Sequence, residues 1–494
     1  MFLFLKAFAD AFNEIGTLSW VNSAGEKIAS RVHVVCAVVD SPARAALLNM
    51  KQFNGFHGCP WCYHPGVHLQ GSLRYPYREH VQQRTHVEIV RDMKKATRTG
   101  QVVNGIKGLS PLLYLRSFDV AWGACPDYMH CVLEGVVKQV TEIWLSHSEA
   151  EAYIGRYVDE VNARLCRIRP PISFSRLPRA LNDRALWKAT EWKFWLLYYC
   201  LPCVQGILPL RYLLHFSKLC HAVFLLIKQT ITEDEVDEAE HVLRDFCVKM
   251  PLLYGEGQCT SNVHLLLHLP QAVRNLGPLW STSMFPFEGA NGDLVKKVTA
   301  SNGVPLQVTE RCLMDQKVDI INESVELPEA WTPLYEQYRG TRRKSSVCRV
   351  LGSQQLPGNV TSAIQQAFLR DIGNVGSLQR FLRAQINSCT IHYVEHFRPQ
   401  KTCSQFIKVD NGGYYEVQRV YKQLATDDIY LVCKQAIVEQ SSFGEVRHIV
   451  TCVLPPAEEA LYVFCANRFD SVCVFLDVGD VNYLCEIPNS FERY

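Results

Sequence analysis

Two features within residues 33–66 have residue types and spacing suited to metal chemistry. Asp40 is a carboxylate between an apolar, β-branched run and the helix-start signal Ser41-Pro42. Cys59-Pro-Trp-Cys62 has the spacing of half a tetrahedral zinc site. Carboxylates suit Mg²⁺ or Mn²⁺, and thiolates suit Zn²⁺. The stretch therefore predicts metal binding, with a plain helix cap and a pair of unligated thiols as the alternatives.

The sequence leaves the second half of a zinc site open. The candidate partners of the cysteine pair are His57, His64, Cys125 and His130. His264 and His268 lie four residues apart, but no Glu follows the first His as it does in zinc proteases, so we interpret them as structural polar residues. A second Cys-x-x-Cys, Cys200 to Cys203, lies in an apolar block and indicates core packing.

Composition narrows the class of protein. A chain of 494 residues with 48% hydrophobic and 20% charged residues is globular, with room for two to four domains. The formal net charge of +2 means that nucleic-acid affinity must come from local patches. No apolar run is long enough for a membrane span, and the amphipathic start is a poor signal peptide. Many of the twenty cysteines lie in apolar runs, which favours a reducing compartment.

The elements that must position these residues follow from hydrophobic periodicity. We expect a helix over 2–15, a strand over 31–40 and mostly loop from 69 to about 110. Further helices are predicted over 128–146, within 186–228, after the capping box Thr232/Glu235, and over 262–276, where Pro270 must kink or end the first part.

The periodicity changes to that of strands after about residue 390. FIKVDNGGYYEVQRV predicts a hairpin with its turn at 410–413, and three later runs predict further strands of a small barrel or sandwich. The preceding linker contains a basic cluster, Arg339, Arg342, Arg343 and Lys344. This cluster is a candidate for DNA phosphate contacts or nuclear import, and a solvated linker is the alternative.

Several short blocks occur in an order that resembles the transposase of CACTA (En/Spm-type) DNA transposons. They are Asp40-Ser-Pro-Ala-Arg-Ala, Lys51-Gln-Phe-Asn-Gly, Gly58-Cys-x-x-Cys62, Arg84-Thr-His86, Gly105-Ile-Lys-Gly-Leu109, Asp127-Tyr-Met-His130, Trp187-Lys-Ala-Thr-Glu191, Asn262-Val-His264, Gly277-Pro-Leu-Trp280, Phe287-Glu288 and Asn291-Gly292. The resemblance covers residues 3 to about 300 and extends more weakly into the tail.

The resemblance implies an RNase H-like core in which three carboxylates hold two Mg²⁺ or Mn²⁺ ions for strand cleavage and transfer. Asp40 matches the second acid and Glu288 the third, and Asp127 with His130 matches the Asp-x-x-His signature between them. Glu288 could instead be an ordinary first-turn acid, and the Asp127 and His130 pair could simply cap a helix within a core.

The first of the family's three metal-binding acids has no match in this sequence. In the family it lies on a strand upstream of the initial helix, whereas this sequence starts at that helix. Asp10 is the only nearby acid, and its helical pattern does not match. We therefore expect a chain that is N-terminally truncated relative to the family and catalytically incomplete.

The sequence thus predicts a mixed α/β chain with five parts. These are a partial RNase H-like core (1–60), a Cys-x-x-Cys loop and helical insertion (61–260), a return to the core (261–325), a linker (326–389) and a β-rich domain (390–494). The predicted function is transposase-like DNA chemistry in the nucleus, with a non-catalytic DNA-, chromatin- or protein-binding role as the alternative and the cytoplasm as the other compartment. DNA is the expected partner, self-association is open, and no membrane or small-molecule cofactor is expected.

Overall fold

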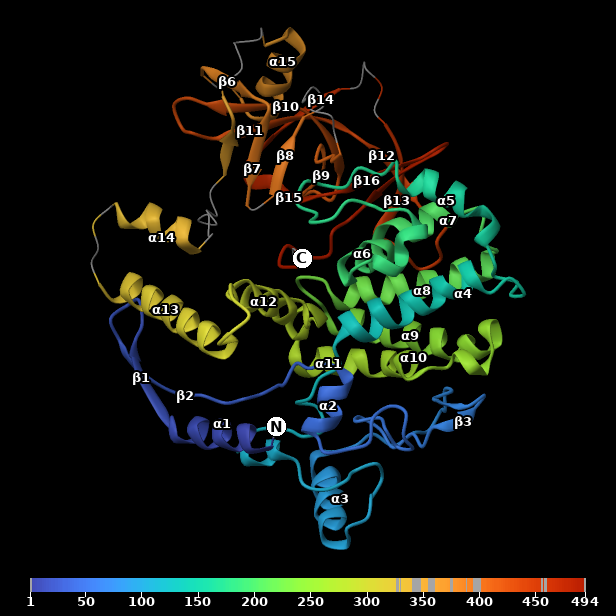
Figure 1. The fold of residues 1–494 in the computed structure, drawn as a ribbon. Helices are drawn as coiled ribbons and strands as arrows, with labels where there is room; N and C mark the ends of the chain where they lie inside the picture. Colours follow the sequence, from blue (N-terminus) through green and yellow to red (C-terminus); the bar gives the residue numbers. More distant parts are fainter. Residues whose placement is uncertain are drawn as a thin grey trace.

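The computed structural model describes residues 2–325, 328, 330–339, 348–353, 360–373, 376–387, 389–393, 401–454, 456 and 460–492. It has an N-terminal region, a helical centre and C-terminal antiparallel sheets (Figure 1). The N-terminal elements are α1 (Phe2–Glu14), β1 (Thr17–Val21), β2 (Lys27–Arg31), α2 (Ser41–Leu47), β3 (Val67–Leu69), β4 (Ser72–Arg74) and α3 (His86–Thr99). The predicted mixed α/β class and the helix over 2–15 are confirmed.

One N-terminal prediction is wrong and a second is incomplete. The strand expected over 31–40 does not form, because β2 ends at Arg31. Residues 32–40 pair with no strand in the described chain. Their contact with the rest of the chain includes a hydrogen bond from Ala37 N–H to Gly123 O at 2.7 Å. An apolar, β-branched run becomes a strand only when a neighbouring strand pairs with it. The interval predicted to be mostly loop contains α3, whose start is fixed by a capping box between Thr85 and Glu88.

The central region is built of packed helices. They are η2 (Met129–Val137, a π-helix), α4 (Lys138–Ser146), α5 (Val158–Leu165), α6 (Ala189–Phe194), η5 (Trp195–Tyr199), α7 (Cys200–Val204), α8 (Leu210–Leu226), α9 (Glu233–Tyr254), α10 (Ser261–Leu265), η7 (Leu266–His268), α11 (Leu269–Leu276), α12 (Phe285–Lys296), α13 (Val304–Ser324) and α14 (Trp331–Arg339). The predicted capping box at Thr232 is present, and Pro270 lies in the first turn of α11, where a missing N–H costs nothing.

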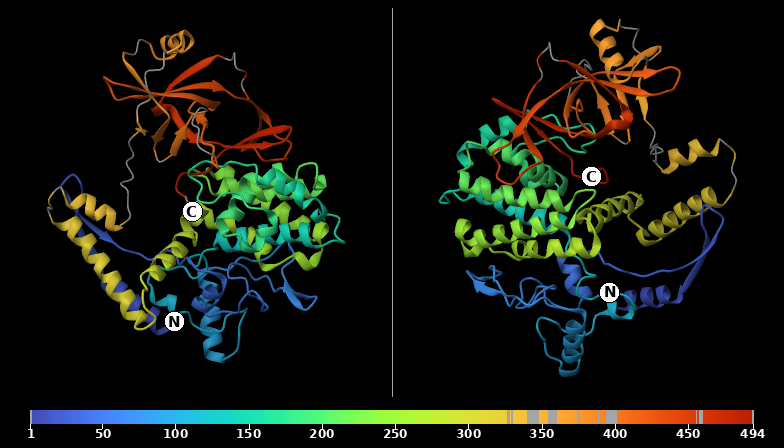
Figure 2. Two further views of the ribbon diagram at one scale, coloured as in Figure 1. Left: turned by 45° about the horizontal axis from the view of Figure 1, so that its top comes forward. Right: turned by 180° about the vertical axis from the view of Figure 1, so that it is seen from behind.

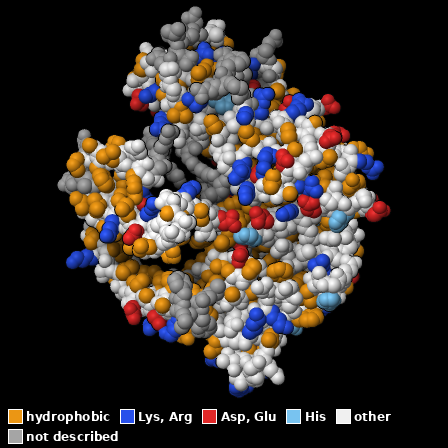
Figure 3. All heavy atoms as spheres, in the orientation of Figure 1, with side chains coloured by type: hydrophobic (Ala, Val, Ile, Leu, Met, Phe, Trp, Pro, Cys, Tyr) orange, Lys and Arg blue, Asp and Glu red, His pale blue; other side chains and the backbone are white. Residues whose placement is uncertain are grey.

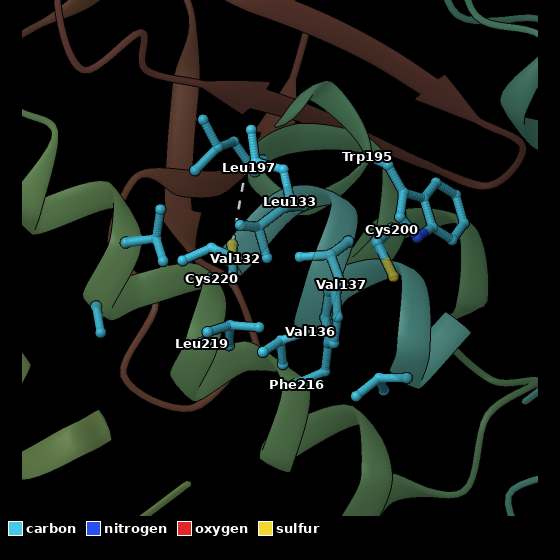
Figure 4. Packing of buried hydrophobic residues seen from close by; sticks show 14 of the residues in the cluster. Val132, Leu133, Val136, Val137, Trp195, Leu197, Cys200, Phe216, Leu219 and Cys220 are labelled. Carbon is cyan, nitrogen blue, oxygen red and sulfur yellow. Dashed lines mark hydrogen bonds between the residues drawn. The ribbon is translucent and has the colours of Figure 1, made fainter. Parts of the chain in front are cut away.

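The core of this region is dense and apolar. Figure 4 shows Val132 and Val136 of η2 facing Phe216 and Cys220 of α8. Trp195 is also buried there, and its indole N–H donates to Thr141 Oγ1 at 3.1 Å. Cys200 and Cys203 are fully buried, which confirms their core role, and all twenty cysteines are free thiols. Such burial holds η2 rigidly against its neighbours.

The C-terminal strands form antiparallel sheets. They are β5 (Arg349–Leu351), β6 (Leu378–Phe381), β7 (Arg383–Ile386), β8 (Cys389–His392), β9 (Phe406–Val409), β10 (Tyr414–Gln423), β11 (Ile429–Gln435), β12 (Ile437–Gln440), β13 (Ile449–Val453), β14 (Leu461–Cys465), β15 (Phe469–Val472), β16 (Val474–Val478) and β17 (Val481–Cys485). α15 (Ser362–Asp371) lies between β5 and β6 in sequence. The predicted hairpin is β9–β10, and β11, β13, β15 and β16 confirm the other strand predictions.

One sheet has the order β14-β11-β10-β9-β15, with β6 also paired to β10; the others are β12-β13-β17-β16 and β5-β7-β8. The sheet β12-β13-β17-β16 shares the core of the helical centre, because Ile449, Val474 and Leu476 belong to the same buried cluster as the helices. Figure 2 shows these sheets seated on the helices from two further sides. An RNase H-like sheet is not among the ladders of the described ranges. Within those ranges no helix is long and apolar enough to cross a membrane.

Candidate functional site

Four buried side chains from distant parts of the sequence converge on one point. Their ligand atoms, in Cys59, Cys62, His264 and His268, all lie within 4.8 Å of one another. Cys59 Sγ is 3.4 Å from His268 Nε2, and Cys62 Sγ is 3.3 Å from His264 Nε2. The two Nε2 atoms are 3.3 Å apart. No other group of three or more His, Cys, Asp or Glu side chains in the described ranges is placed to share a metal ion.

These distances fit a tetrahedral zinc ion. With bonds of about 2.3 Å to sulfur and about 2.05 Å to nitrogen, such an ion holds two nitrogens about 3.3 Å apart and a sulfur about 3.6 Å from a nitrogen. All four side chains are at most 4% exposed. Two thiolates and two imidazoles form a closed Cys₂His₂ set with no position for water or substrate, which is the arrangement of a structural zinc site.

Close backbone packing shapes the loop that carries the cysteines. A Cβ on Gly58 would lie 2.2 Å from Gln52 O, and a Cβ on Gly105 would lie 2.2 Å from His57 O. Gly105 also has φ of 84°, a conformation that glycine adopts without strain. A larger residue at Gly58 or Gly105 would therefore displace the loop and the Cys59 thiol beside it.

A buried arginine holds the cysteine-bearing loop in place by hydrogen bonds to backbone carbonyls. Arg84 donates to Cys62 O at 3.0 Å, His57 O at 3.1 Å and Asn104 O at 2.8 Å. Burial lowers the pKa of this guanidinium, while the nearby Cys59 acts in the opposite direction. Arg84 thereby fixes the Cys59–Cys62 segment, here called the knuckle, and places a positive charge near the two sulfurs.

The histidines come from two successive helical segments: His264 lies in α10 and His268 ends the short η7 that follows it. Thr260 caps α10 by accepting from Val263 N–H, and the four-residue spacing puts His264 and His268 on one helix face. α10 packs tightly on η2, because a Cβ on Gly135 would lie 2.6 Å from Asn262 Nδ2. The zinc candidate therefore joins the N-terminal loop to the helical core.

The pKa values of the Cys59 and Cys62 thiols are shifted in opposite directions, so Cys62 keeps its proton more readily than Cys59. Burial raises the pKa of both, but the hydrogen bond from Cys62 and the two imidazoles hold the pKa of Cys59 well below its usual range. The pKa of Cys62 is raised by its hydrogen bond to Cys59 and by burial. A bound Zn²⁺ would replace that proton and favour both thiolates.

None of the four predicted partners belongs to the cysteine cluster. The two histidines interpreted as structural polar residues, His264 and His268, complete it instead. His64 uses both ring nitrogens, accepting from Gly66 N–H at 3.0 Å and donating to Pro76 O at 2.9 Å. Burial lowers the pKa of His64 to about 4. Cys125 donates to Ala37 O at 3.8 Å, and neither His57 nor His130 belongs to the cluster. The His-x₃-His spacing is itself typical of zinc fingers, and that signal could have identified the pair.

A second polar cluster joins the residues that match the Asp-x-x-His signature and the third acid. His130 Nδ1 is 2.6 Å from Asp127 Oδ2, and His130 Nε2 is 3.4 Å from Glu288 Oε1. The hydrogen bond to Asp127 raises the pKa of His130, against the effect of burial. Asp127 is 1% exposed, whereas the Glu288 side chain is 53% exposed. The cluster therefore runs from the core to the solvent.

Asp127 also organises the backbone around it. Its carboxylate accepts from Met129 N–H at 3.3 Å, His130 N–H at 3.1 Å and Met284 N–H at 2.9 Å. The last of these bonds ties the start of η2 to the residue before α12, 157 positions later. Asp127 thus acts as a helix cap and as the link that brings Glu288 to His130.

Asp40 caps α2, accepting from Ala43 N–H at 2.8 Å, which is the alternative weighed for it. Its segment lies against the stretch that precedes Asp127, since Ala37 bonds Gly123 and Cys125. In the described ranges, Asp40 and Glu288 belong to no group of three acids placed to share a metal ion. Asp10 lies in α1 and pairs with Lys6 at 2.5 Å.

Only part of the predicted basic cluster can be placed. Arg339 pairs with Asp319 at 3.1 Å and with Asp315 at 3.6 Å. Arg342, Arg343 and Lys344 lie outside the described residues.

Comparisons with protein-family models, with curated proteins and with solved structures found no match to this chain. The resemblance to CACTA transposases therefore stays a prediction.

Proposed function

We propose that this chain is a transposase-like, DNA-binding protein of the CACTA kind with an RNase H-like core, and that it does not cleave DNA by itself. The observation that supports the proposal is the meeting of the residues that carry the resemblance. His130 contacts both Asp127 and Glu288, and the segment that ends at Asp40 is bonded through Ala37 to Gly123 and Cys125, just before Asp127. Three matched residues from two segments thus meet, and the segment that carries the fourth lies next to one of them.

Asp40 and Glu288 would be the residues that hold Mg²⁺ or Mn²⁺, which in this class activates the attacking oxygen and stabilises the leaving one. Hard cations of this kind need several oxygen ligands. Since the described residues offer no group of three acids there, these two carboxylates would bind the ion weakly. His130, held by Asp127, would position Glu288 and carry a proton at Nδ1.

DNA affinity would come from local positive charge, because the net charge is only +2. Arg342, Arg343 and Lys344 are the proposed phosphate contacts, and Arg339 would have to leave its acidic partners to join them. Such contacts release counterions, so the affinity falls steeply with salt.

The test uses the full chain with a fluorescent duplex that carries terminal inverted repeats, in Mg²⁺ and in Mn²⁺. We expect anisotropy to report binding that weakens between 50 and 200 mM salt, by about tenfold or more if several phosphates are contacted. We expect no strand cleavage on a denaturing gel. Cleavage that disappears in Asp40→Ala would show that the chain is catalytically complete.

Two variants, one with three basic residues replaced and one with two, separate DNA binding from the alternative. Replacing Arg342, Arg343 and Lys344 together by Gln should weaken binding, whereas replacing the paired surface residues Arg244 and Lys249 by Gln should not. A folded protein that binds no duplex even at low salt would favour the non-catalytic, protein-binding role.

A further inference from the structure

The helix α13 exposes an apolar stripe that nothing in the described chain covers. Leu306, Leu313, Met314, Ile320 and Ile321 are 61%, 50%, 58%, 59% and 43% exposed. Figure 3 shows hydrophobic side chains gathered over the part of the surface formed by α13 and α14. None of the residues of α13 is buried, which is unusual for a helix of 21 residues.

The opposite face of α13 is already occupied. Asp319 accepts from Tyr335 Oη at 2.9 Å, Asp315 accepts from Tyr338 Oη at 2.7 Å, and Asn322 accepts from Trp331 Nε1 at 3.0 Å. These bonds fasten α13 to α14 and fix which side of α13 faces outward. The stripe is therefore presented in a defined direction.

Two opposite charges lie along the middle of the stripe. Glu310 and Lys317 are both exposed and make no ion pair with another described residue. They are seven residues apart, about 10.5 Å along the axis, so they cannot reach each other within one helix. Each charge is therefore available to a partner.

The order of the stripe is self-complementary about the point between Leu313 and Met314. Reversing the helix there brings Leu306 level with Ile321, Leu313 level with Met314, and Glu310 level with Lys317. We propose that two copies of this chain associate through α13, antiparallel about a two-fold axis at this point. Leu306 then meets Ile321 and Leu313 meets Met314, while each Glu310 meets Lys317 of the second copy. Ile320 comes level with Gln307, so the apolar contact is made by the other four residues.

The charges select the antiparallel arrangement. A parallel pair in register would set Glu310 against Glu310 and Lys317 against Lys317, and like charges at such positions are unfavourable. An isologous contact of this kind also closes on itself, so it gives dimers and not filaments. One helix pair buries less than the roughly 1,600 Å² of a standard interface, so we expect a micromolar dimer.

Charge reversal in the full chain tests the proposal by sedimentation velocity over a series of concentrations. Glu310→Lys and Lys317→Glu, each alone, should weaken dimerisation by about tenfold, because two attractive pairs per dimer become repulsive. The double variant, Glu310→Lys with Lys317→Glu, should return the dimer to wild-type strength. Glu323→Lys, an equal charge change away from the stripe on the same helix, should have no effect.

Leu313→Asp should leave a monomer with an unchanged far-ultraviolet circular dichroism spectrum, since Leu313 is exposed in the single copy. A wild-type chain that stays monomeric at 100 µM would overturn the proposal. So would single reversals that do not weaken the dimer, or a double reversal that fails to restore it. The proposal does not depend on DNA binding, and the assay contains no DNA.

Discussion

The two polar clusters of this protein both contact the helical centre, but they differ in solvent exposure. We call the first the closed cluster and the second the open cluster. The cluster of Cys59, Cys62, His264 and His268 is buried and supplies four ligands to one point. The cluster of Asp127, His130 and Glu288 begins in the core and ends in solvent. A saturated, dry ligand set is typical of a structural metal site, whereas the second cluster is a hydrogen-bonded chain of two acids and a histidine that the described structure does not place to share a metal ion. The two clusters therefore differ in burial and in how many ligand atoms converge on one point.

The largest effect should come from breaking the closed cluster. Cys59→Ser or His264→Ala should abolish stoichiometric zinc, measured by inductively coupled plasma mass spectrometry, and lower the free energy of unfolding by on the order of 5 kcal/mol, because zinc binding contributes to folding. Cys259→Ala, also buried but outside the cluster, should keep the zinc. Equal zinc in all three variants would show that this cluster is not the metal centre.

The second largest effect on stability should come from Asp127, the buried end of the open cluster. Asp127→Ala removes the acceptor of three backbone N–H groups and of the His130 ring, so unfolding by urea should show a loss of about 3 kcal/mol. Glu134→Ala, an exposed residue of the same helix, should change stability by less than about 0.5 kcal/mol. A small effect of Asp127→Ala would mean that α12 is held to η2 by other contacts.

The histidine should give this cluster a pH dependence. Asp127 raises the pKa of His130 in the folded protein. The resulting stability is fully present below the ordinary histidine pKa, near 6.5, and is lost as the pH rises through the folded value. The stability difference between wild type and His130→Gln should therefore shrink from pH 6 to pH 9. A difference that grows over this range would contradict the assigned hydrogen bond.

The exposed end should matter least for stability. Glu288→Gln should change the free energy of unfolding by less than about 0.5 kcal/mol, because a half-exposed ion pair is worth little. It should also reduce the pKa elevation of His130 seen by nuclear magnetic resonance, since Glu288 contributes to it. A large loss of stability here would place Glu288 with the structural cluster instead of the open one.

Local signals in the sequence predicted much of the fold. The capping box at Thr232, the helix over 2–15 and the hairpin at 410–413 are all fixed by neighbouring residues, and all were predicted correctly. The strand over 31–40 failed because an apolar pattern becomes a strand only when a neighbouring strand pairs with it, and residues 32–40 pair with none in the described ranges. α3 was missed although Thr85 and Glu88 carry the same capping signal as Thr232 and Glu235.

The site shows the same division. The sequence by itself determined the Cys59–Cys62 knuckle, the capping role of Asp40 and the pairing of Asp127 with His130, because each depends on residues within a few positions. Only the tertiary structure decided that His264 and His268 complete the cysteine cluster and that Glu288 meets His130. Such contacts join segments more than a hundred residues apart, and they depend on the packing of α10 and α12 against η2. Spacing along a chain can mark His264 and His268 as a candidate pair, but it cannot encode the packing that brings them to the cysteines.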